Sequence, residues 1–120
     1  MHEHCNIALI NRLRTEDREA VIIEFMSKSL RLLARERYTS DHLRAVFLPL
    51  RAIAKRALDL DARNITIAHN HPSGDGCPSL SDINATRRLT RLCHDIGIEV
   101  CDHLIVTSDQ VFSFKQQGML

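Results

Sequence analysis

What the sequence lacks argues against several classes of protein. It has only 4 glycines and 3 prolines among 120 residues, with no low-complexity stretch and no long Gly, Ser or Pro linker, so we do not expect disorder. Its 16 Lys and Arg residues are balanced by 15 Asp and Glu residues. The resulting net charge of +1 gives no overall basic surface of the kind that nucleic-acid-binding domains carry.

Signals for membranes and secretion are also missing. No apolar run is long enough to cross a bilayer, and residues 1–4 lack the basic and apolar regions of a signal peptide. The cysteines are irregularly spaced and form no CxxC motif; they are Cys5, Cys77, Cys93 and Cys101. We therefore expect a cytoplasmic protein with no membrane partner, whose cysteines are free thiols.

The composition that remains is that of an ordinary globular protein. Apolar residues make up 44% and charged residues 26%, and the length suits one domain over residues 1–120. One local cluster of charge is formed by Arg87, Arg88 and Arg91. A solvated helix face explains this cluster more simply than a nucleic-acid interface does.

The hydrophobic pattern predicts both helices and strands. Apolar residues three and four apart indicate helices, and short β-branched or alternating runs indicate strands. The predicted elements are a helix at 6–17, strands at 20–26 and 30–38 joined by a turn, a helix at 49–61, a strand at 65–68, a helix from Ser79 that stops at Gly97, and strands at 98–106 and 111–114. Strands alternate with helices in the middle and pair as hairpins at both ends. This order predicts an α/β fold, a mixed β-sheet flanked by helices.

The string His69-Asn70-His71-Pro72 directly follows the strand predicted at 65–68. Histidines at i and i+2 at the end of a strand point to one face, with Asn70 opposite. Pro72 favours an extended conformation at His71. A carboxylate in the first turn of the next helix, Asp82, can supply a third ligand, so this pattern predicts a metal site.

Two imidazole nitrogens and one carboxylate oxygen suit zinc. Three protein ligands leave one position for water, whose pKa zinc lowers from that of bulk water toward ~7. A nearby carboxylate can take the proton and pass it to a leaving amine, and a hydroxyl can donate a hydrogen bond to the developing oxyanion. The pattern therefore predicts a site for hydrolysis.

These residues resemble a known family. The spacing His69-x-His71, seven residues, Ser79, two residues, Asp82 is similar to the JAMM (MPN+) metalloprotease motif. The longer string from His69 to Asp75, with Pro78-Ser79 and Asp82-Ile83, looks more narrowly like the bacterial RadC family, which is named for DNA repair. Further matches around the motif fall in the same order, and the resemblance spans residues 19–120.

The resemblance implies an α/β fold like that of the JAMM/MPN and cytidine deaminase domains. It implies zinc on His69, His71 and Asp82, with Ser79 as the hydroxyl that stabilises the oxyanion. The substrate that it implies is a peptide or isopeptide bond.

The resemblance also implies a glutamate on an early strand as general acid/base. We expect Glu36, because it follows two apolar residues on one face of the strand at 30–38; Glu24 is the second choice. Relatives often carry a Gly-Thr pair just after this point, where this chain has Asp41-His42. The register of the glutamate therefore stays open, and a solvated Glu36 is the alternative.

Simpler interpretations of the other residues also stay open. Ser79-x-x-Asp82 fits a helix-capping pattern as well as a metal motif. The pair Asp102-His103 fits either partners behind the metal ligands or ordinary hydrogen bonding on a strand. Cys77 lies in the loop near the predicted site, where an incidental thiol is the simpler explanation.

Three functions are consistent with a zinc site in this fold. The first is a zinc metallopeptidase or isopeptidase, and the second is a non-catalytic zinc-containing binding module associated with nucleic acid or DNA repair. The third, a zinc deaminase, needs His-x-Glu followed by Pro-Cys-x-x-Cys. This chain has His71 in place of the glutamate, and Cys77 precedes Pro78 with no second cysteine, so we disfavour that function.

Overall fold

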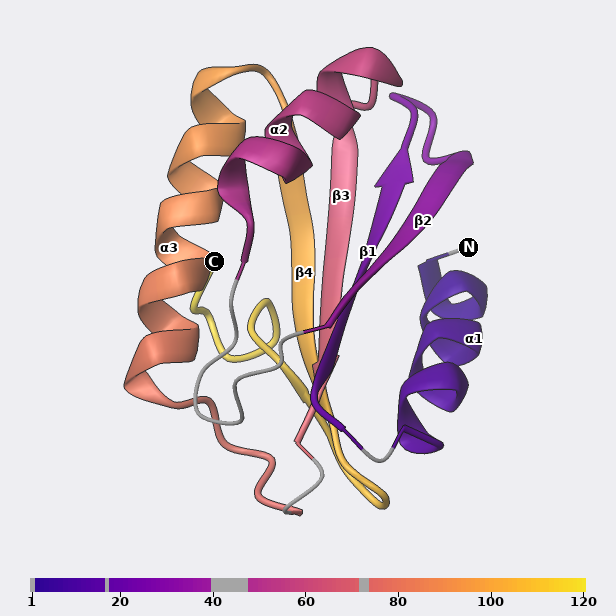
Figure 1. Ribbon diagram of the computed structural model, residues 1–120, viewed down its shortest axis with the longest axis vertical. Helices are drawn as coiled ribbons and strands as arrows, with labels where there is room; N and C mark the ends of the chain where they lie inside the picture. Colours follow the sequence, from indigo (N-terminus) through magenta and orange to yellow (C-terminus); the bar gives the residue numbers. More distant parts are fainter. Residues whose placement is uncertain (1, 17, 40–47, 72–73) are drawn as a thin grey trace.

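A five-stranded sheet with helices on both faces forms the frame of the molecule (Figure 1). The computed structural model describes residues 2–16, 18–39, 48–71 and 74–120, with side chains from Ile7 onward. The elements are α1 (His2–Arg14), β1 (Ala20–Met26), β2 (Leu32–Thr39), α2 (Leu50–Asp59), β3 (Asn64–Asn70), α3 (Leu80–Asp95), β4 (Glu99–Val106) and β5 (Val111–Ser113).

Strand β3 is the central strand of the sheet, whose order is β2-β1-β3-β4-β5. Strand β1 pairs antiparallel with both β2 and β3, and β5 pairs antiparallel with β4. Strands β3 and β4 are parallel, and α3 is the crossover that a parallel pair requires. The predicted mixed sheet, with a hairpin at each end of the chain, is confirmed.

The ends of most elements differ from the prediction by one to four residues, and two of these differences bear on the site or on the start of the chain. Strand β3 reaches Asn70, beyond the predicted end, because it pairs with β1 on one side and β4 on the other and all of its residues are buried. Helix α1 begins at His2, earlier than the apolar pattern indicated. The pairs Asp41-His42 and Pro72-Ser73 lie outside the described residues.

The two faces of the sheet bury separate apolar clusters. Helices α2 and α3 cover one face, where Ile53 and Leu89 pack with Ile23 and Ile67. Helix α1 covers the other face with Leu9 and Leu13. Because side chains alternate along β3, His69 lies on the face of Ile67, toward α3.

Three chain segments meet at one end of this frame (Figure 1): the end of β3, the start of β1 and the start of α3. The antiparallel pairing brings the start of β1 beside the end of β3, with Val21 opposite His69. No helix in the described ranges combines the length and the apolar character that a membrane span needs.

We expect the substitution Ile67→Ala to destabilise the protein by about 2–5 kcal/mol, because it opens a cavity beneath α3. Ile67 is fully buried, whereas Leu58 on α2 is 60% exposed. Urea unfolding measures the free energy of unfolding of each variant, with Leu58→Ala as the control. Equal stabilities of the two variants would contradict this account of the core.

Candidate metal centre

The two histidines of the motif stand at the end of β3. His69 is fully buried and faces α3, and His71 follows directly after the strand with its ring toward His69. The ring nitrogens His69 Nε2 and His71 Nε2 are 2.9 Å apart. As predicted, Asn70 points to the opposite face.

Asn70 fixes the segment that leads into β1. Its side-chain oxygen accepts a 2.7 Å hydrogen bond from the backbone N–H of Ala20, and its Nδ2 donates a 2.8 Å bond to the carbonyl of Arg18. These two bonds hold Glu19 between them, beside His71. The position of the segment before β1 is therefore fixed by the Asn70 side chain from the neighbouring strand, β3.

Asp82 approaches the histidines from the first turn of α3. Its Oδ2 lies 3.3 Å from His71 Nε2, and its Oδ1 lies 3.7 Å from His69 Nε2. Ser79 is the N-cap of this helix: its Oγ accepts a bond from the Asp82 N–H, and Asp82 Oδ2 accepts one from the Ser79 N–H. The predicted capping pattern is confirmed. The cap holds the Asp82 carboxylate beside the histidines, so capping and the predicted metal site are compatible.

Four side chains thus converge on one point. Glu19, His69, His71 and Asp82 each offer a ligand atom, and these atoms all lie within 4.8 Å of one another. Ligand atoms about 2.1 Å from a tetrahedral zinc ion are about 3.4 Å apart. The separations among His69, His71 and Asp82 run from 2.9 to 3.7 Å, with one Asp82 oxygen facing each histidine, and they bracket that value. The group is able to hold a metal ion of zinc's size.

Comparison with known proteins identifies the family to which the chain belongs. Residues 2–119 match the family described as the RadC-like JAB domain. The chain belongs to this family. A UPF0758 protein of Aquifex aeolicus is 40% identical over 105 residues, which cover 88% of this chain and 46% of that protein. The UPF0758 protein YfjY of Escherichia coli is 36% identical over 104 residues, 87% of this chain and 65% of that protein. This RadC-like JAB domain thus spans about half to two thirds of the length of these relatives, and neither name states an activity.

The protonation of this RadC-like JAB domain's cluster follows from burial and from the contacts between its members. Burial lowers the pKa of His69 and of His103, the ring that lies behind it. Burial would raise the pKa of Asp82, but the neighbouring His69 and His71 rings and the hydrogen bond from the Ser79 N–H outweigh it and hold that pKa well below its usual range. The hydrogen bond with Asp82 raises the pKa of His71, and burial raises that of Glu19. The charged Asp82 carboxylate and the neutral His69 ring are in the state that binds metal, whereas the raised pKa of His71 favours the protonated ring, which must lose a proton to bind metal.

The two glutamates expected from the sequence lie outside this cluster. Glu36 is on the expected face of β2, but its Oε1 accepts a 2.7 Å bond from Arg56 Nε on α2. Glu24 is fully buried and pairs with Arg35 at 2.7 Å. Glu19 joins the histidines instead, and the sequence interpretation missed it. Alternation back from Val21 places Glu19 on the histidine face, but that signal needs the pairing of β1 with β3.

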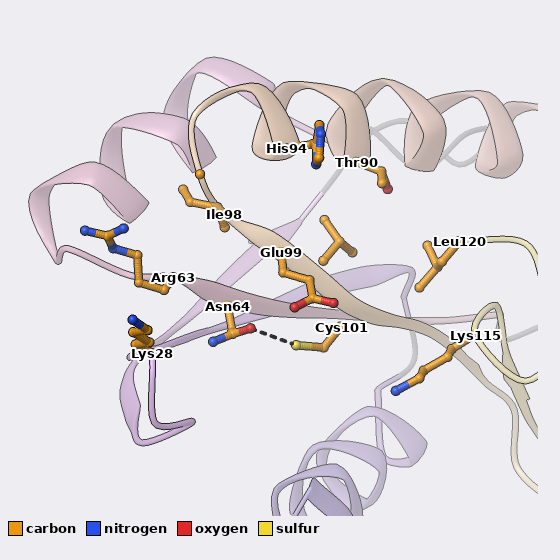
Figure 2. Close-up of a pocket in the computed structure, with 12 residues that line it drawn as sticks. Lys28, Arg63, Asn64, Thr90, His94, Ile98, Glu99, Cys101, Lys115 and Leu120 are labelled. Atoms are coloured by element: carbon orange, nitrogen blue, oxygen red, sulfur yellow. Dashed lines mark hydrogen bonds between the residues drawn. The ribbon is translucent and has the colours of Figure 1, made fainter.

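Two cavities differ in their relation to the cluster. One, of about 250 Å³, lies beside His71 and includes Arg14, Asn70 and Thr107. A larger one, of about 830 Å³, lies at the starts of β3 and β4 (Figure 2), where Asn64, Glu99 and Cys101 line it. The larger cavity is therefore at the opposite end of β3 and contains none of the four cluster residues. Cys77, outside the cluster, is an exposed free thiol.

We expect Asn70→Ala to destabilise the protein by about 1–3 kcal/mol, because it leaves the buried Ala20 N–H without an acceptor. Asn70 is 3% exposed, whereas Asn84 on α3 is exposed. Hydrogen–deuterium exchange should accelerate at Ala20 in the variant, with Asn84→Ala as the control. Unchanged exchange at Ala20 would show that Asn70 does not fix this segment.

Proposed function

We propose that this RadC-like JAB domain is a zinc-dependent hydrolase of peptide or isopeptide bonds. The convergence of His69, His71 and Asp82 within zinc-ligand distances of one another is the observation that carries the proposal. Two nitrogens and one oxygen make a donor set typical of catalytic zinc. When bound, zinc acts as a Lewis acid that makes water a nucleophile at neutral pH.

Glu19 fits the role of general acid/base better than Glu36 does. Its carboxylate lies in the cluster, and burial raises its pKa, which favours a group that takes up a proton and returns it. Glu36 has Arg56 as its ionic partner. We therefore assign to Glu19 the proton transfer from water to the leaving amine.

Ser79 remains able to stabilise an oxyanion while it caps α3. Its Oγ accepts the hydrogen bond from the Asp82 N–H, so its own hydroxyl hydrogen is free for another acceptor. Ser79 is exposed, next to the helix turn that carries Asp82.

A closed structural zinc site is the second candidate, and the position of Glu19 also favours it. Glu19 is close enough to the other three residues to serve as a fourth ligand. A four-ligand site leaves no position for water, and the domain would then be a non-catalytic binding module, with nucleic acid among its candidate partners. The role of Glu19 therefore separates the two functions.

The zinc site is tested by metal binding to purified, chelator-treated protein. We expect one zinc ion per chain in the wild type and an affinity lowered by more than about 100-fold in Asp82→Asn, since the change removes a ligand rather than a partner behind one. Asp95→Asn, on the exposed end of the same helix, is the matched control. A wild type that takes up no zinc would overturn the proposed function.

The hydrolase itself is tested with Glu19→Gln. We expect this variant to bind zinc as the wild type does and to lose about 10²–10⁴ in the rate of hydrolysis across a peptide and isopeptide library. Glu36→Gln should keep both properties. Weaker zinc binding by Glu19→Gln, together with an inactive wild type, would favour the closed structural site.

A further inference from the structure

A chain of buried hydrogen bonds leads away from His69 on the side opposite the cluster. His69 Nδ1 lies 2.6 Å from His103 Nε2 on β4, and His103 Nδ1 lies 2.6 Å from Thr86 Oγ1 on α3. Thr86 Oγ1 in turn donates a 2.8 Å bond to the backbone carbonyl of Asp82. All four residues are at most 2% exposed. The chain therefore joins one expected zinc ligand to another through the interior of the protein.

The direction of each bond follows from the number of hydrogens that each group has. A carbonyl only accepts, so the single hydroxyl hydrogen of Thr86 goes to Asp82. Thr86 Oγ1 must then accept from His103, which places the hydrogen on His103 Nδ1. A neutral ring has one N–H, so His103 Nε2 accepts and His69 Nδ1 donates. His69 Nε2 is thereby left without a hydrogen, facing His71 and Asp82.

The surroundings of His103 favour its neutral form. The ring is fully buried and stacks on Phe114 at a centroid distance of 4.6 Å. The adjacent carboxylate, Asp102, bonds to Ser113 Oγ and to the backbone N–H groups of His103 and Lys115, not to the ring. A charged His103 would have no carboxylate hydrogen-bonded to it in an apolar interior, which is costly.

We propose that Thr86 and His103 are positioning residues that hold His69 in the tautomer needed to bind metal through Nε2. The inference rests on the proposed zinc site. Because this series of hydrogen bonds ends on the backbone carbonyl of Asp82, it also links the first turn of α3, which carries Asp82, to the ring of His69. His71 has its own, separate support, since its Nδ1 lies 2.7 Å from the carbonyl of Asp75.

The tautomer can be measured without any metal. Nitrogen-15 NMR of the histidine rings in the chelator-treated wild type should show hydrogen on Nδ1 and none on Nε2 for His69, and hydrogen on Nδ1 for His103. Finding the hydrogen of His69 on Nε2 would overturn the inference, whatever the protein does with zinc.

The variant Thr86→Val removes the hydroxyl and keeps the branched shape of the side chain. We expect it to weaken zinc binding by about 10–100-fold, the usual effect of removing a partner behind a metal-ligating histidine, and to release His69 from its single tautomer. Thr86→Ser should restore both properties, because serine supplies the same hydroxyl.

Thr90→Val is the matched control. Thr90 lies one turn further along α3, and its hydroxyl donates the same kind of backbone bond, to the carbonyl of Thr86 at 2.8 Å. Equal zinc affinity and equal histidine spectra in Thr86→Val and Thr90→Val would overturn the inference. A wild type that binds no zinc would instead overturn the proposed function, and the tautomer of the metal-free protein would still decide the role of Thr86 and His103.

Discussion

The pairing register between β1 and β3 is the constraint on which the candidate metal centre depends. With Val21 opposite His69, the residue two before Val21 comes beside His71, and this residue is Glu19. A slip of one residue would turn every side chain of β3 to the other face and send His69 toward α1. Burial of β3 on both faces and the bonds of Asn70 hold the register.

The start of α3 has two purposes that share the same atoms. Ser79 and Asp82 satisfy backbone N–H groups that a helix would otherwise leave unpaired, and they fix the Asp82 carboxylate between two imidazoles. Helix stability and ligand geometry are therefore coupled. The carboxylate is in place because the helix begins there.

Two buried carboxylates in this fold have different partners. Asp82 contacts histidines, which can exchange a proton for a metal ion, whereas Glu24 is held by the guanidinium of Arg35, which keeps its charge. Glu24 Oε1 has no hydrogen-bond partner among the described atoms. Burial alone therefore does not identify a carboxylate as part of a functional site. The groups that the carboxylate contacts must also be known.

The sequence by itself determined the secondary structure, the mixed sheet, the shared face of His69 and His71, and the cap at Ser79. The secondary structure, the shared face and the cap depend on residues within a few positions of one another, so periodicity and local hydrogen bonding reveal them. The mixed character of the sheet follows from the order of helices and strands along the chain. The tertiary structure decided which acid joins the histidines and what lies behind His69. Glu19 and His103 reach that point through strand pairings between segments some 30 to 50 residues apart, and no local pattern encodes which strands become neighbours.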